Sequence, residues 1–240
     1  MNAALRSYVL VHGAFHGGWC WRHVAERLRA RGHRVFTPTL TGLGERAHLR
    51  HLEPDLHTHI ADVVQTLFCE ELQDVVLVGH SYAGAVISGV ADCVPEVLRH
   101  LVFLDALVLP PGGHVLYAAS AEAQSYYHGL SREAGGSGLI PVPPADFFGV
   151  ADPAQIAWLE RHLSPHPLAS FLSPLDLAHP PGNGLPVTYV HCTAPEFTEI
   201  RNAFALARTM PGWRHVELAT GHDAMVSAPR EVAELLLSIG

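Results

Sequence analysis

The chain has 240 residues, of which 48% are hydrophobic and only 16% charged, and its formal net charge is −8 at pH 7. This length and apolar share predict one large α/β domain with a substantial core, and they exclude an intrinsically disordered chain. The acidic balance, without a stripe of Lys and Arg, predicts no nucleic-acid binding.

Apolar, β-branched segments alternate along the chain with amphipathic ones, which predicts strands alternating with helices. Strands are expected at residues 7–11, 33–37, 75–79, 100–108, 185–192 and 213–218. Helices are expected at residues 21–31, 56–72, 83–93, 198–210 and 230–239. This alternation favours a mostly parallel sheet, with ligand chemistry just beyond the carboxyl ends of its strands.

Composition changes after the Pro-Pro-Gly-Gly sequence of residues 110–113. Up to about residue 185 the chain is rich in Pro, Ala, Ser and aromatic residues and shows no clear strand. Only short helices are expected there, around residues 115–127, 145–150 and 153–162.

Cysteine and histidine usage predicts neither disulfides nor a metal site. The four cysteines lie far apart in apolar segments, so we interpret them as buried free thiols: Cys20, Cys69, Cys93 and Cys192. The 18 histidines show no tight spacing with Cys or carboxylates. The N-terminal segment is too short for the apolar part of an export signal, which favours a cytoplasmic protein without a membrane span.

One stretch, V-V-L-V-G-H-S-Y-A-G at residues 75–84, predicts a strand, a tight turn and a helix, with Ser81 at the tip. A turn that exposes a nucleophilic serine needs small residues two before and two after it. Gly79 and Ala83 occupy these positions, although the G-x-S-x-G signature has glycine at the second. For this stretch alone, a serine that caps a helix is the alternative interpretation.

A nucleophilic serine needs a base, and the base needs an anion that orients it. His222 lies between the last strand and the last helix, at the same edge of the sheet as Ser81, and is the expected base. The acid has two candidates, Asp105 and Glu196, which follow successive strands. We favour Asp105, because a carboxylate in an apolar setting requires a partner, although it could instead cap a turn.

Backbone N–H groups must stabilise the oxyanion that forms when the serine attacks a carbonyl. Tyr82 would supply one N–H at the start of the helix after Ser81. Ala14, in the glycine-rich loop 13–18, would supply the other. That loop lacks the signatures of phosphate-binding loops, so a nucleotide is not expected.

Four stretches together resemble the α/β-hydrolase superfamily: V-H-G-A-F-H-G-G-W-C-W at 11–21, L-T-G-L-G-E-R at 40–46, V-G-H-S-Y-A-G at 78–84 and G-H-D-A-M at 221–225. Within it they resemble the plant methyl esterases, hydroxynitrile lyases and related bacterial esterases. The resemblance implies a six-stranded core formed by residues 1–108 and 186–240. It also implies a helical cap at residues 109–185, no cofactor and often a homodimer.

The chain departs from the pattern of this family in ways that affect function. The usual aspartate after the penultimate strand is absent, and Pro195 stands about where it is expected. In related hydrolases without it, an acid after the earlier strand substitutes, which again favours Asp105. The hydroxynitrile lyases of this branch have a lysine after the catalytic histidine and a threonine in the first loop. Here Asp223 and Gly13 stand there, so lyase activity is not expected.

The leading hypothesis is a serine hydrolase that cleaves carboxylic esters of small, largely apolar substrates through an acyl-enzyme. A receptor of the same fold that binds its ligand without hydrolysis is the alternative, followed by a hydroxynitrile lyase or a C–C bond hydrolase. The residues expected to bind substrate are His16, Trp19, Tyr126, Phe147 and Trp158.

Overall fold

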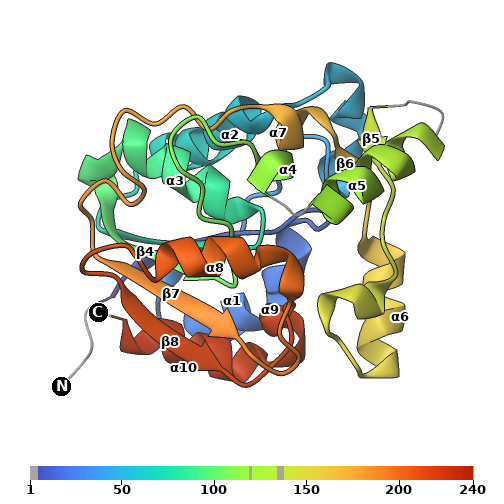
Figure 1. The fold of residues 1–240 in the computed structure, drawn as a ribbon. Helices are drawn as coiled ribbons and strands as arrows, with labels where there is room; N and C mark the ends of the chain where they lie inside the picture. Colours follow the sequence, from blue (N-terminus) through green and yellow to red (C-terminus); the bar gives the residue numbers. More distant parts are fainter. Residues whose placement is uncertain (1–4, 119–120, 134–137, 240) are drawn as a thin grey trace.

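A computed structural model describes residues 5–118, 121–133 and 138–239, and its centre is a six-stranded sheet between two helical layers (Figure 1). The strand order is β2-β1-β3-β4-β7-β8, and every neighbouring pair is parallel. The strands are β1 Ser7–Val11, β2 Arg34–Phe36, β3 Val75–His80, β4 Leu98–Leu104, β7 Val187–Cys192 and β8 Arg214–Leu218. The expected parallel sheet is confirmed.

Side chains alternate between the two faces of the sheet along each strand, and in the buried central strands both sets are mostly apolar. Each face is therefore covered by helices. Helices α2 (Leu56–Cys69), α3 (Ala83–Cys93) and α8 (Arg201–Ala207) cover one face. Helices α1 (Arg22–Arg29) and α10 (Pro229–Ser238) cover the other and contact each other.

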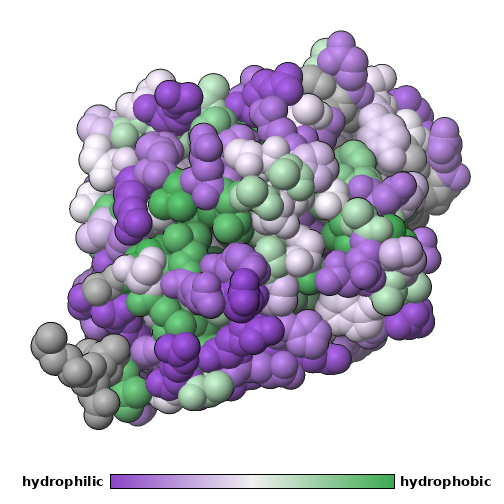
Figure 2. Space-filling model, turned by 90° about the horizontal axis from the view of Figure 1, so that it is seen from below, coloured by the Kyte–Doolittle hydropathy of each residue, from purple (hydrophilic) through white to green (hydrophobic). Residues whose placement is uncertain are grey.

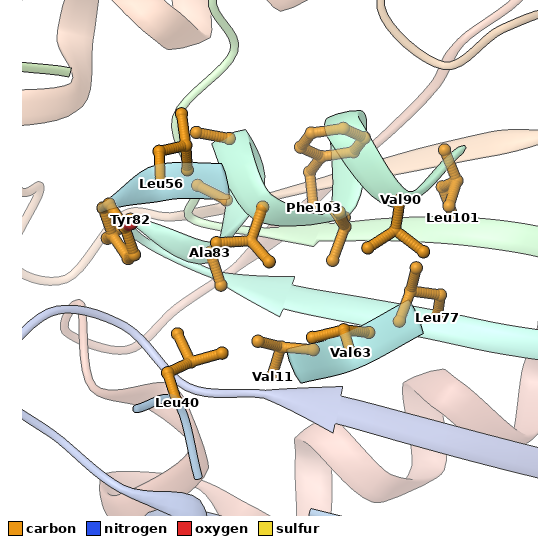
Figure 3. Packing of buried hydrophobic residues seen from close by; sticks show 14 of the residues in the cluster. Val11, Leu40, Leu56, Val63, Leu77, Tyr82, Ala83, Val90, Leu101 and Phe103 are labelled. Carbon is orange, nitrogen blue, oxygen red and sulfur yellow. The ribbon is translucent and has the colours of Figure 1, made fainter. Parts of the chain in front are cut away.

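Figure 3 shows one of these two core layers from close by. Leu77 and Phe103 come from β3 and β4, and Val63 and Val90 come from α2 and α3; all four are fully buried. The layer places α3 directly behind the end of β3, which fixes the two residues between them, Ser81 and Tyr82.

Several short helices complete the core. They are η1 Gly18–Trp21, η2 Gly44–Leu52, η3 Pro95–Val97, η5 Thr198–Ile200 and α9 Ala224–Ser227. Of these, η2, η3 and α9 were not expected from the sequence, and η1 precedes the helix expected at residues 21–31. η3 and α9 span three and four residues, too few to show a helical period, whereas η2 buries none of its nine residues and so has no apolar face to detect.

The segment between β4 and β7 is mainly helical, as expected, but it also contains two strands that were not. Its helices are α4 Val115–Ala118, α5 Ala121–Glu133, η4 Ala145–Phe148, α6 Pro153–His162 and α7 Ala169–Leu172. The strands β5 (Leu139–Ile140) and β6 (His166–Pro167) pair antiparallel. Two-residue strands have no alternating pattern to detect. The arrows of β7 and β8 in Figure 1 point toward the side where α5 and α6 lie.

The surface agrees with the low share of charged residues. Figure 2 shows a face on which hydrophobic residues gather in patches between hydrophilic ones. In the described part of the chain, no helix is both long and apolar enough to cross a membrane.

The cysteines are free thiols, but only two of them are buried. Cys20 and Cys192 lie in the core, whereas Cys69 and Cys93 are exposed. The expectation of burial was wrong for the second pair, because each is the last residue of its helix, where the apolar face ends. The described residues contain no group of three or more His, Cys, Asp or Glu side chains that could hold a metal ion.

Candidate active site

Ser81 lies in a sharp turn between β3 and α3 and has a φ of 53°. This left-handed conformation is rare for a residue with a side chain. In a sharp turn between a strand and a helix, it exposes the serine hydroxyl at the edge of the sheet. Gly79 is required because a Cβ there would lie 2.7 Å from the carbonyl oxygen of Ala83. A Cβ on Gly84 would lie only 2.0 Å from the carbonyl oxygen of Leu107. In this protein Gly84, rather than residue 83, is the position after the serine where the close approach demands glycine.

We therefore expect Gly84→Ala to destabilise the fold by about 1–3 kcal/mol, because the methyl group meets backbone that cannot move aside. Gly129→Ala is the matched control, since a Cβ on Gly129, within α5, has nothing within 4 Å. The control should be neutral or stabilising by about 0.5–1 kcal/mol. Urea unfolding of both variants measures this difference, and equal midpoints for the two would contradict it.

Ser81, His222 and Asp105 are joined by two hydrogen bonds. The Ser81 hydroxyl oxygen lies 2.9 Å from His222 Nε2, and His222 Nδ1 lies 2.7 Å from Asp105 Oδ2. His222 and Asp105 are buried, and Ser81 is partly exposed. With Nδ1–H donated to the carboxylate, Nε2 carries the lone pair that can accept the serine proton.

Asp105 is held in place by the backbone that surrounds it. It follows β4 with a φ of 44°, and its N–H donates to the carbonyl oxygen of Val190 at 2.7 Å. Its second carboxylate oxygen accepts the N–H of Cys192 at 2.9 Å. Leu107 N–H donates to the carbonyl oxygen of Ser81 at 2.9 Å, which ties this loop to the serine turn.

The alternative acid, Glu196, lies elsewhere. Its carboxylate is exposed and 3.6 Å from Arg201 Nε. The structure thus brings Asp105, and not Glu196, to the ring of His222.

The two expected oxyanion donors flank Ser81. Ala14 and Tyr82 are both buried, and neither backbone N–H donates a hydrogen bond within the described residues. Gly13 allows the first loop to come this close, since a Cβ there would lie 2.9 Å from Ser81 Cβ. Two free N–H groups beside a serine hydroxyl are the arrangement that an oxyanion requires.

A neutral histidine and a strained residue shape the loop that carries Ala14. His12 Nδ1–H donates to the carbonyl oxygen of Gly13 at 2.8 Å, and its Nε2 accepts the N–H of Leu40 at 3.0 Å. Burial lowers the pKa of His12 to about 3, so its ring stays neutral. Phe15 has a φ of 69°, and its carbonyl oxygen accepts the N–H of Ser164 at 2.9 Å. The segment between β4 and β7 thereby braces the loop.

A pocket opens over Ser81 and is mostly apolar. Its walls come from both sides of the site and include Leu116, Tyr127, Phe147, Phe148, Phe171 and Phe197. Glu199 is the only carboxylate among the described residues that line it.

Of the residues expected to bind substrate, the structure places two in this pocket. His16 and Phe147 line it, whereas Trp19, Trp158 and Tyr126 do not. Trp19 stacks on the His16 ring and packs against Trp158 behind it. Tyr126 points outward and is 44% exposed, because neighbouring residues on a helix face different ways and Tyr127 takes the inward position.

Sequence reasoning missed Phe197 and Glu199. The ring of Phe197 stacks on that of His222, with 3.9 Å between centroids. Phe197 lies in the loop after β7, which was considered only as the source of the acid, and Glu199 lies in η5, at the start of the segment expected to be helical. The feature of the sequence that could have indicated this part of the pocket is the aromatic residue directly after Glu196.

Residues 8–235 match the model of the alpha/beta hydrolase family, so the chain belongs to that family. The resemblance seen in the sequence is confirmed. The chain is 42% identical to a carbendazim hydrolyzing esterase of Nocardioides sp. (strain SG-4G), over 98% of this chain and 100% of the relative. It is 25% identical to methylesterase 18 of Arabidopsis thaliana, over 96% of this chain and 95% of the relative. A solved extracellular alpha/beta-hydrolase from a Paenibacillus species superposes with a TM-score of 0.84 at 26% identity, over 98% of this chain and 99% of that one.

Proposed function

We propose that the protein is a serine esterase that hydrolyses small, neutral carboxylic esters through an acyl-enzyme. The unbroken chain of hydrogen bonds from Ser81 through His222 to the buried Asp105 is the observation that carries this proposal. The two relatives named as esterases, which match over nearly their full length, support the broader class, an ester-cleaving hydrolase.

In the proposed reaction, Ser81 Oγ attacks the ester carbonyl carbon while His222 Nε2 takes the hydroxyl proton. Asp105 stabilises the imidazolium that results, and the N–H groups of Ala14 and Tyr82 stabilise the oxyanion. The tetrahedral intermediate expels the alcohol, which receives the proton from His222. Water then attacks the acyl-enzyme with His222 as base, releasing the acid and restoring Ser81.

The pocket walls support neutral, apolar substrates. Aromatic and aliphatic side chains favour apolar groups, and Glu199 repels a substrate that already carries a negative charge. We assign the wall-forming residues 109–185 as a cap over the core of residues 1–108 and 186–240. A homodimer and a cytoplasmic location stay predictions from the sequence.

The test is hydrolysis of p-nitrophenyl acetate, butyrate, octanoate and hemisuccinate, together with carbendazim, a methyl carbamate. We expect turnover of the neutral esters and a kcat/KM for the butyrate at least about tenfold above that for the anionic hemisuccinate. A fluorophosphonate should label Ser81, as read by peptide mass. If no ester is turned over and Ser81 stays unlabelled, the receptor alternative replaces this proposal.

A further inference from the structure

His16 is buried and both of its ring nitrogens face acceptors. Nδ1 lies 2.7 Å from the carbonyl oxygen of Ala14, and Nε2 lies 2.9 Å from Asp223 Oδ2. Neither a carbonyl nor a carboxylate oxygen can donate, so each nitrogen must carry a proton to make its bond. An imidazole ring with two N–H groups is the charged imidazolium.

The electrostatics of the pair agree with this assignment. Burial alone lowers the pKa of His16, but the negative charge of Asp223 and the hydrogen bonds outweigh it, so the pKa is raised. Burial likewise raises the pKa of Asp223, but the positive His16 outweighs it and the pKa is lowered. His16 is 1% exposed and Asp223 0% exposed, so water screens neither charge.

The pair joins the two loops on which the proposed chemistry depends. His16 holds the carbonyl oxygen of Ala14, whose N–H is a proposed oxyanion donor. Asp223 directly follows the proposed base, His222. No hydrogen bond links the side chain of Asp223 to Ser81 or to the imidazole of His222 in the described structure, so it takes no part in the proton transfer.

Two further contacts hold the base loop around the pair. The N–H of Asp223 donates to the carbonyl oxygen of Phe148 at 3.0 Å. His80 Nε2 lies 3.0 Å from the carbonyl oxygen of His222, to which it donates. Burial and the neighbouring His222 lower the pKa of His80 well below its ordinary value, so this ring stays neutral and His16 is the charged partner of Asp223.

We propose that His16 and Asp223 are positioning residues: an ionised, buried pair that sets the distance between the oxyanion loop at Ala14 and the base loop at His222. The inference rests on the proposed esterase function. A displacement of catalytic groups by about 1 Å can cost about 100-fold in rate, so the pair acts on kcat rather than on substrate binding.

The decisive variant is Asp223→Asn, which keeps the shape of the side chain and removes its charge. We expect kcat for p-nitrophenyl butyrate to fall about 10- to 100-fold with KM within about twofold of wild type. Affinity for a trifluoromethyl ketone, which forms a tetrahedral oxyanion on the serine, should fall by the same factor as kcat/KM. His16→Gln should lower kcat and the affinity for the ketone by a similar factor, although its KM can also change because His16 lines the pocket. The double variant should lose about as much kcat as either single variant.

Asp92→Asn is the matched control. Asp92, at the end of α3, also contacts a histidine, His179, at 2.9 Å, but that histidine is exposed on the surface. This variant should keep the wild-type kcat. A kcat for Asp223→Asn within twofold of wild type would overturn the proposal. So would a lower kcat with unchanged affinity for the ketone, because that result would indicate a general structural role.

A second measurement remains decisive if the Asp223 variant does not fold. Ring-nitrogen NMR of the wild-type protein at neutral pH should show His16 with both nitrogens protonated, assigned by its loss in His16→Gln. A neutral His16 in the wild type would overturn the proposal. This measurement does not depend on turnover, so its failure and the failure of the esterase function are distinguishable.

Discussion

Replacing Ser81 by alanine is expected to lower kcat for p-nitrophenyl butyrate about 10⁶-fold, since the acyl-enzyme can no longer form. Fluorophosphonate labelling should disappear with it. Ser81 is partly exposed, and within the described part of the chain its hydroxyl forms a hydrogen bond only with His222, so the melting temperature should change little.

Ser88→Ala provides the matched control, because Ser88 is a buried serine of α3, the helix that follows Ser81. Its hydroxyl donates to the carbonyl oxygen of Gly84 at 2.8 Å and lies outside the pocket lining. We expect a loss of about 1 kcal/mol of stability but unchanged kcat. If Ser81→Ala retained ester turnover near the wild-type rate, the mechanism would be wrong.

The second large effect is expected for Asp105→Asn, with kcat lowered about 10⁴-fold. The amide nitrogen of asparagine would donate to His222 Nδ1, so the ring proton would move to Nε2. The ring could then no longer accept the hydroxyl proton of Ser81. The variant keeps the volume of the side chain, and thermal unfolding checks that it still folds.

Glu196→Gln is the control for this experiment, because Glu196 lies in the loop after β7 and its carboxylate forms an exposed ion pair with Arg201. Exposed pairs contribute about 0–1 kcal/mol, so both stability and kcat should stay near wild type. Loss of activity in Glu196→Gln alone would instead assign the acid role to that residue.

Local patterns in the sequence were sufficient for the framework of the fold. The strand before Ser81 begins with a run of mostly β-branched residues bounded by a glycine, and such a run favours a buried strand. Expected boundaries differ from the observed ones by only a few residues: 56–72 was expected where α2 spans Leu56–Cys69. The elements α9, β5 and β6 escaped because they span too few residues to show a period, and η2 escaped because it buries none of its nine residues.

The pocket was harder to predict than the proposed catalytic residues. Ser81 and His222 each stand where a strand ends, and the parallel sheet brings those ends together. Which aromatic residues face the pocket depends on rotation of short helices in the 109–185 segment, and no apolar period in the sequence fixes that rotation. Of the two adjacent tyrosines, Tyr127 lines the pocket and Tyr126 does not.

The sequence by itself determined the alternation of strands and helices, the serine turn and the loops that hold Ala14 and His222, because each is marked by a local pattern of residue types. The sequence favoured Asp105 over Glu196, but only the tertiary structure placed the Asp105 carboxylate against His222, and only it paired His16 with Asp223, 207 residues away. Both pairings are electrostatic: a buried charge must find a partner of opposite sign or a hydrogen-bond donor, and which one it finds depends on how distant loops meet.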